Sequence, residues 1–153
     1  MSSPYPDRIF RITEPVTESN CYVIREKNRC MIIDPNDFPA IRELLQKWNM
    51  KPELVLLTHE HCDHIGGLNQ LRETYPVTVV ATQACSEGIG NKTRNMSRMM
   101  ETFLYFKSGE KTFVHYPPFQ CEKADLTFTD QLCCEFGAKE LELIRLPGHT
   151  PGS

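Results

Sequence analysis

The stretch Thr58-His-Glu-His-Cys-Asp-His-Ile-Gly-Gly67 carries the densest chemistry in the chain. Within six residues it holds four side chains that bind borderline metal ions well: His59, His61, Asp63 and His64. It follows residues 54–57, a short apolar run typical of a buried strand. If the extended path continues for two residues, His59 and His61 point to the same side, because side chains alternate with period two. A structural role explains one histidine here well, but not the whole cluster.

A second segment, Pro147-Gly-His-Thr-Pro-Gly-Ser153, follows the apolar residues 141–146. A histidine in a Gly/Pro loop is a weak metal signal alone. Open α/β sheets usually place their sites at the carboxyl ends of strands, as for the first cluster. Beside that cluster, the signal from His149 becomes strong. Gly66 and Gly67 allow the backbone to approach an ion or another segment closely.

These segments resemble the metallo-β-lactamase superfamily of metallohydrolases. The resemblance covers His-x-His-x-Asp-His at 59–64, Gly-His-Thr-Pro-Gly-Ser at 148–153, and the opening strands at 20–24 and 30–35. It implies an α/β fold, the αββα sandwich of this superfamily, with residues 1–153 as one domain that covers mainly the first αβ half. It also implies that one ion is held by His59, His61 and His149, and that Asp63 and His64 help to hold a second. Asp63 would also be catalytic, by orienting the nucleophile or accepting its proton.

Imidazole and carboxylate ligands without thiolate suit Zn²⁺, although iron and manganese remain alternatives. The resemblance implies a metal-dependent hydrolase that uses a metal-bound hydroxide on a small-molecule ester or thioester, as in the glyoxalase II-like and lactonase-like branch. Phosphodiesters, β-lactams and lactones are alternative substrates. His61 argues against the diiron oxygen reductases of the superfamily, which have glutamate at this position.

The superfamily also uses a bridging aspartate and a last histidine from its second half, and this chain stops at Ser153. We therefore keep an alternative of another class, a catalytically inactive metal-binding fragment. We expect the chain to supply only the first of the two sheets. Self-association through the uncovered face of that sheet would then follow, because uncovered strands expose an apolar patch.

Bulk properties are those of an ordinary soluble domain. The net charge of −3 gives no reason to expect nucleic acid, and no apolar run approaches the ~18 residues that span a membrane. The first residues lack the features of a signal peptide, which favours a cytoplasmic location. Seven cysteines without a Cys-x-x-Cys pair predict free thiols. Cys62 is expected to point away from the ion.

The remaining pattern predicts a strand at 8–13, a hairpin at 21–34, and helices at 39–50 and 67–75. A strand at 77–81 completes a parallel strand–helix–strand unit. Strand-like segments return at 126–129, 132–136 and 140–146. Asp34 either orients a ligand histidine or forms a turn.

Residues 83–125 differ from the rest and are interpreted as a cap-like insertion beside the active site. They contain an apolar stripe at helical spacing: Met96, Met99, Met100, Phe103 and Leu104. This stripe could line a substrate pocket, since methionine surfaces are adaptable. Simple helix packing explains it equally well.

Overall fold

A mixed sheet forms the centre of the molecule in the computed structural model, which describes residues 8–153. Its strands lie in the order β1-β2-β3-β4-β5-β6, with bounds Ile9–Thr13, Asn20–Glu26, Arg29–Ile33, Lys51–Leu56, Thr78–Thr82 and Leu126–Phe128. β1, β2 and β3 are antiparallel neighbours, whereas β3, β4, β5 and β6 run parallel. The predicted hairpin and the predicted parallel unit are therefore confirmed.

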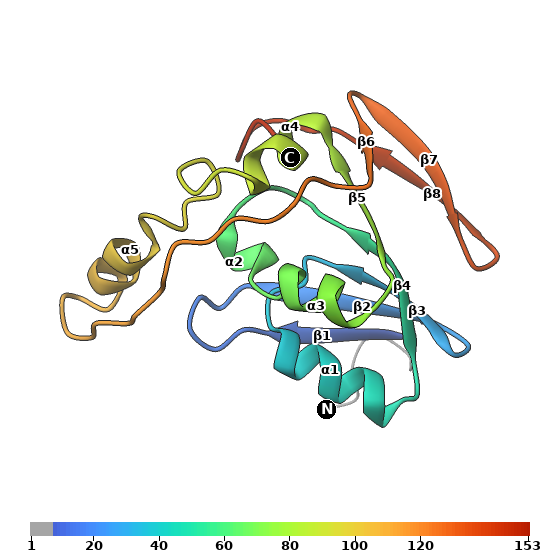
Figure 1. Cartoon of the computed structure of the whole chain (residues 1–153), viewed down its shortest axis with the longest axis horizontal. Coiled ribbons are helices and arrows are strands. Elements are labelled where there is room, and N and C mark those ends of the chain that lie inside the picture. The colour runs from blue at the N-terminus through green and yellow to red at the C-terminus, as the bar shows by residue number, and fades with distance from the viewer. Residues whose placement is uncertain (1–7) are drawn as a thin grey trace.

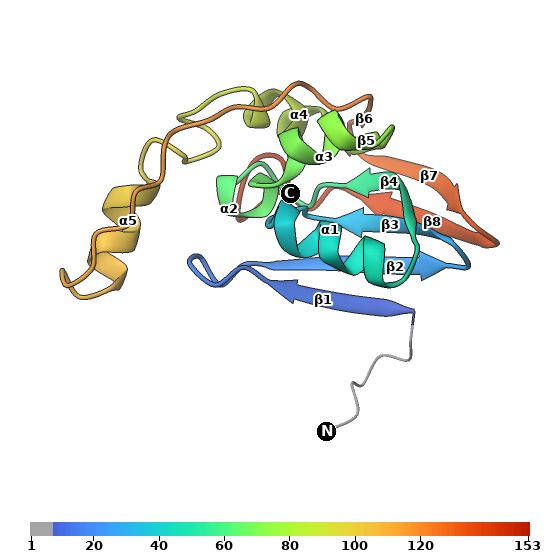
Figure 2. The same ribbon diagram turned by 60° about the horizontal axis from the view of Figure 1, so that its bottom comes forward.

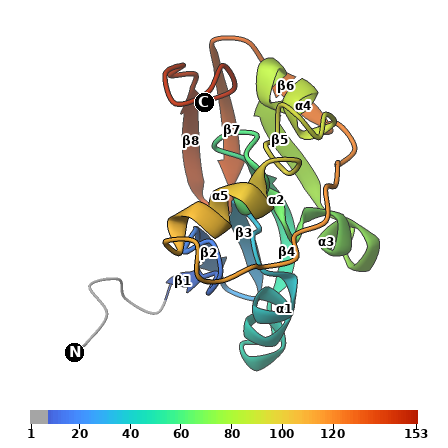
Figure 3. The same ribbon diagram turned by 90° about the vertical axis from the view of Figure 1, so that its left-hand side faces the viewer.

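Helices α1 (Phe38–Lys47) and α3 (Leu68–Thr74) cover one face of this sheet (Figure 3). α1 begins where the Asp37 side chain accepts a hydrogen bond from the amide of Ala40. Its apolar side buries Ile41 and Leu45, and burial of each such side chain stabilises the fold by roughly 1.5–3 kcal/mol. The short helix α2 (Cys62–Ile65) precedes α3 and carries the second part of the histidine motif.

The carboxyl ends of β3, β4 and β5 lie at one edge of the sheet, because these strands are parallel neighbours (Figure 1). Gly66 and Gly67 close this edge against residues 36–38. A Cβ on Gly66 would lie 2.8 Å from the carbonyl oxygen of Asn36. The close approach expected of these glycines is thus to another segment of the chain.

Strands β7 (Gln131–Phe136) and β8 (Lys139–Ile144) form a separate antiparallel hairpin on the face of the sheet opposite α1 and α3 (Figure 3). Phe136 packs there against Met31, Leu56 and Val80. The expectation that the chain supplies only the first sheet is therefore wrong. Alternating apolar residues give the hairpin a face that covers part of the sheet. Self-association through the remaining face stays a prediction.

Residues 83–125 begin with α4 (Gln83–Ile89), which packs beside β5 and buries Cys85 and Ile89 in the main core. The chain then leaves the sheet, and we call residues 91–124 the arm. It carries α5 (Met100–Lys107) away from the sheet (Figures 1 and 2). The structure assigns no strand to 83–125, and the cap-like role of this segment stays a prediction.

The predicted apolar stripe divides between two environments. Met100 and Leu104 are buried and pack around Cys62. Met96, Met99 and Phe103 are 42–57% exposed. Within residues 8–153, no helix is long and apolar enough to cross a bilayer.

Candidate metal centre

Three histidines from two distant segments meet beyond the carboxyl end of β4. His59 and His61 follow β4, and His149 follows β8. The three ring centroids are 4.8–4.9 Å apart. Nε2 of His149 lies 3.2 Å from Nδ1 of His61, and one nitrogen of each ring lies within 4.8 Å of the others. The structure therefore brings together the three residues predicted for the first ion.

His59 offers a bare nitrogen to this cluster. Its Nδ1 lies 2.9 Å from Oγ1 of Thr58, and this hydroxyl donates its proton to Asp34 at 2.6 Å. Because a hydroxyl has one proton, it must accept from Nδ1–H of His59. Nε2 is then the unprotonated nitrogen, buried and without a hydrogen-bond partner in the described part of the chain. A buried, unpaired lone pair is costly unless it binds something, so this atom fits a metal ligand.

The electrostatic environment favours the neutral form of His59 and His61. Burial lowers the pKa of His59 to about 4, and the neighbouring His64 contributes in the same direction. Burial and then His149 lower the pKa of His61. Metal binding requires the neutral ring, so lowered pKa values favour binding at neutral pH.

Asp34 orients the fourth histidine of the cluster. Its carboxylate is almost fully buried and accepts hydrogen bonds from the amide and hydroxyl of Thr58 and from Nδ1 of His64 at 2.9 Å. Burial opposes protonation of His64, but the hydrogen bond and charge of Asp34 outweigh it and raise the pKa of His64. Asp34 also has a positive φ of 55°. Asp34 therefore both positions His64 and bends the chain, while the role of His64 as a ligand stays a prediction.

With Nδ1 of His64 bonded to Asp34, its Nε2 faces Oδ2 of Asp63 at 3.6 Å. The backbone carbonyl of Asp63 accepts a hydrogen bond from Ser19 at 2.6 Å, which fixes the start of α2. These two side chains are adjacent, as expected for a second ion. Their ligand roles and the catalytic role of Asp63 stay predictions.

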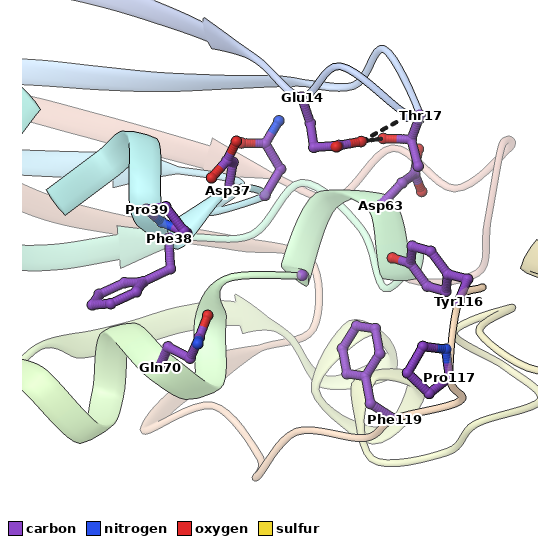
Figure 4. A pocket seen from close by; sticks show the side chains of 12 residues that line it. Glu14, Thr17, Asp37, Phe38, Pro39, Asp63, Gln70, Tyr116, Pro117 and Phe119 are labelled. Atoms are coloured by element: carbon purple, nitrogen blue, oxygen red, sulfur yellow. Dashed lines mark hydrogen bonds between the residues drawn. The ribbon is translucent and has the colours of Figure 1, made fainter. Parts of the chain in front are cut away.

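Asp63 also borders a pocket of about 410 Å³ (Figure 4). Tyr116 and Phe119 of the arm line one side of this pocket, and Phe38 and Gln70 line the side formed by α1 and α3. Space for a small molecule therefore adjoins the proposed second ion, between the arm and the helices.

Cys62 does not belong to the cluster. Its side chain is fully buried with Met100 and Leu104, and burial raises the pKa of its thiol to about 12. The expectation that Cys62 points away from the ion is confirmed. His115 lies on the arm, where its side chain is 80% exposed and 2.9 Å from Glu101.

The sequence reasoning missed three residues that support the cluster. Thr58 links Asp34 to His59, and Thr150 bonds to Glu60 behind the histidines. The alternation that places His59 and His61 on one side also places Glu60 on the other, toward the interior. That signal was available from the sequence.

Two histidines after the parallel strand β4 and a third after the hairpin strand β8 converge, and one of them has a buried nitrogen without a proton. Such a cluster defines a metal-binding α/β protein. A family model described as the metallo-beta-lactamase superfamily matches residues 15–153, and the chain belongs to this superfamily. The crystal structure of the B3 metallo-beta-lactamase BLEG-1 superposes with a TM-score of 0.78 at 25% identity, over 95% of this chain and 64% of that one. An archaeal superfamily protein from Sulfolobus tokodaii has a TM-score of 0.66 at 21% identity, covering 96% and 59% of the two chains.

Two relatives are hydrolases by name. A hydroxyacylglutathione hydrolase from Klebsiella pneumoniae is 41% identical over 71 residues, which is 45% of this chain and 28% of the relative. The probable metallo-hydrolase YqgX from Bacillus subtilis is 28% identical over 137 residues, which is 89% of this chain and 58% of the relative. The chain thus spans between about a quarter and three fifths of the length of these relatives.

Proposed function

We propose that the chain forms the metal-binding part of a hydrolase that prefers Zn²⁺ and acts on a small-molecule ester or thioester. One observation carries the proposal: the rings of His59, His61 and His149 converge, and the buried Nε2 of His59 has no hydrogen-bond partner within residues 8–153. Three histidines with an open fourth position are the usual composition of a catalytic zinc site. All are neutral-ring donors, which suits a divalent borderline ion.

When bound, the metal would supply hydroxide at neutral pH by lowering the pKa of a water molecule to about 7. The residues of the chain do the rest. Asp63 lies next to His64 and borders the 410 Å³ pocket. Its carboxylate can therefore hold or accept a proton between His64 and a molecule in the pocket. Tyr116 and Phe119 offer an apolar wall that can orient the acyl or leaving group.

A thioester is supported by the similarity to a hydroxyacylglutathione hydrolase. A β-lactam or lactone is the alternative that the similarity to BLEG-1 supports, and a phosphodiester is another. The alternative of a different class is a metal-binding chain without catalysis.

The test loads the purified chain with Zn²⁺ and measures metal content by elemental analysis. Turnover is then followed on a nitrophenyl ester, a glutathione thioester, a chromogenic cephalosporin and a nitrophenyl phosphodiester. His61→Ala removes one of the three converging rings. His115→Ala is the matched control, because His115 lies on the arm outside the cluster.

We expect His61→Ala to lose the bound metal and all turnover, while His115→Ala keeps both. Ester or thioester turnover that fails in His61→Ala supports the proposal. Metal binding without turnover of any substrate would favour the non-catalytic alternative. Turnover of the cephalosporin or the phosphodiester alone would replace the proposed substrate class, and unchanged metal content in His61→Ala would overturn the site itself.

A further inference from the structure

Glu60 is a buried acidic residue between two of the converging histidines. Glu60 is 2% exposed, and its side chain lies against Gly88, Gly152 and Thr150. Oε2 of Glu60 accepts a hydrogen bond from the hydroxyl of Thr150 at 2.8 Å, ninety positions later in the sequence. Thr150 is itself buried and directly follows His149. One hydrogen bond therefore joins the two segments that supply the histidines.

Two glycines make room for the Glu60 side chain. A Cβ on Gly152 would lie 2.2 Å from Oε2 of Glu60, and a Cβ on Gly88 would lie 2.6 Å from its Cγ. Real Cβ atoms do not approach so closely, so both segments need glycine where they enclose Glu60. The side chain of Glu60 is thus enclosed between α4 and residues 147–153, which we call the His149 loop.

The same loop depends on Glu60 and Thr150 for its shape. The hydroxyl of Thr150 accepts a hydrogen bond from the amide of Gly152 at 3.1 Å while it donates to Glu60. The carbonyl of Gly152 in turn accepts from Thr82 at 2.8 Å, at the start of α4. His149 itself is exposed, and within residues 8–153 the hydrogen-bond and ring contacts of its imidazole are with His59 and His61. Its position therefore depends on how the loop behind it is anchored.

We infer that Glu60 is a positioning residue that holds the His149 loop, and with it the third ring of the metal cluster, against the His59–His61 segment. The inference rests on the metal-binding part of the proposed function and adds a residue to it. Partners that orient metal ligands typically change metal affinity by 10–100-fold when they are replaced. A ring that is free to move away would leave a two-histidine site that binds more weakly.

The experiment compares variants that remove the hydrogen bond with variants that keep it. Glu60→Met removes the acceptor at similar size, and Glu60→Gln retains an acceptor oxygen. Thr150→Val removes the donor, and Thr150→Ser retains it. Affinity for Zn²⁺ is measured by competition with a chromophoric chelator, and the geometry of the site by the visible absorption of the Co²⁺-loaded chain. Leu71→Ala, a fully buried core residue of α3, controls for a general loss of stability.

We expect Glu60→Met and Thr150→Val each to weaken Zn²⁺ binding by 10–100-fold and to alter the Co²⁺ spectrum. Glu60→Gln and Thr150→Ser should stay within about threefold of the parent chain, as should Leu71→Ala. The double variant Glu60→Met/Thr150→Val should be no weaker than Thr150→Val alone, because Glu60→Met breaks only a hydrogen bond that Thr150→Val has already removed.

Affinity within threefold of the parent and an unchanged Co²⁺ spectrum in Thr150→Val would overturn the inference, even if Glu60→Met failed to fold. An equal loss in Leu71→Ala would also overturn it, since a general loss of stability would then explain the effect. These readouts need no turnover. A chain that binds Zn²⁺ but hydrolyses nothing would defeat the proposed hydrolase while still deciding the role of Glu60.

Discussion

The histidine motif directly follows β4 and the arm follows α4, and the two regions are built in opposite ways. In the motif, Asp34 accepts three hydrogen bonds and Glu60 lies in a fitted cavity, so nearly every polar group has a defined partner. In the arm, Phe103 and Phe106 of α5 are 57% and 60% exposed. An exposed ion pair between Lys107 and Glu18 links α5 to the connection between β1 and β2. The motif, with its defined hydrogen bonds, holds the histidine cluster, and the loosely packed arm borders the pocket beside it.

The largest expected effect comes from removing the hydrogen bonds of Asp34 beside the histidine motif. Asp34→Ala removes the acceptor for Thr58 and His64, and each buried donor left unsatisfied costs about 1–3 kcal/mol. Alanine at the positive φ of position 34 adds about 1–2 kcal/mol. We expect the metal-free variant to lose about 3 kcal/mol or more of unfolding free energy, measured by urea denaturation.

Asp34→Asn is the matched control. Asparagine tolerates a positive φ and keeps an oxygen that can accept from the amide of Thr58. It should lose roughly half as much free energy as Asp34→Ala, or less. Equal losses in the two variants would mean that the carboxylate network contributes little and that the turn alone matters.

The same contrast explains what the sequence could predict. The strands, the helices α1 and α3 and the parallel unit followed from the apolar pattern, because burial against one sheet imposes that pattern. The grouping of His59, His61 and His149 was implied by the resemblance to the superfamily, together with their places after two apolar strands. The hairpin β7–β8 was expected as strands, but its packing on the sheet was not, since alternation does not show what an apolar face will cover.

The apolar stripe of the arm shows a second limit. Helical spacing cannot tell a face that packs from one that stays exposed, so Met100 and Phe103 were grouped together although only Met100 is buried. Likewise, the hydrogen bond between Glu60 and Thr150 joins residues far apart in the chain. Such pairings depend on the folded positions of two loops, which periodicity does not encode.

The second prediction compares a buried residue of α5 with an exposed one. Leu104 is 5% exposed and packs near Cys62, whereas its neighbour Phe103 is 57% exposed. Leu104→Ala should cost about 2 kcal/mol of unfolding free energy, at the low end for buried leucines, because the cluster around it is small. Phe103→Ser should change it by no more than about 0.5 kcal/mol. Urea denaturation of both variants measures this, and a large loss in Phe103→Ser would show that the exposed side of α5 has a partner in solution.

The smallest expected effect is on the pH dependence of stability in the metal-free chain. It tests two histidines whose pKa values are shifted in opposite directions. Burial lowers the pKa of His59 to about 4, below the ordinary value of 6.5. Between pH 6.5 and 4 the unfolded chain therefore takes up a proton that the folded chain does not, and stability falls as the solution is acidified. The pKa of His64 is raised, because Asp34 outweighs burial. Its contribution is fully present below pH 6.5 and is lost as the pH rises through its folded pKa.

Replacing these residues should therefore change the pH dependence in opposite directions. Between pH 7.5 and 5.0, His59→Gln should lose less stability than the parent chain, because the unfavourable protonation is gone. His64→Gln should lose more, because the compensating contribution of the pair with Asp34 is gone. The urea midpoints of the three chains, measured with chelator at both pH values, give the two differences. Shifts of the same sign in both variants would show that Asp34 does not separate the pKa values of these two histidines.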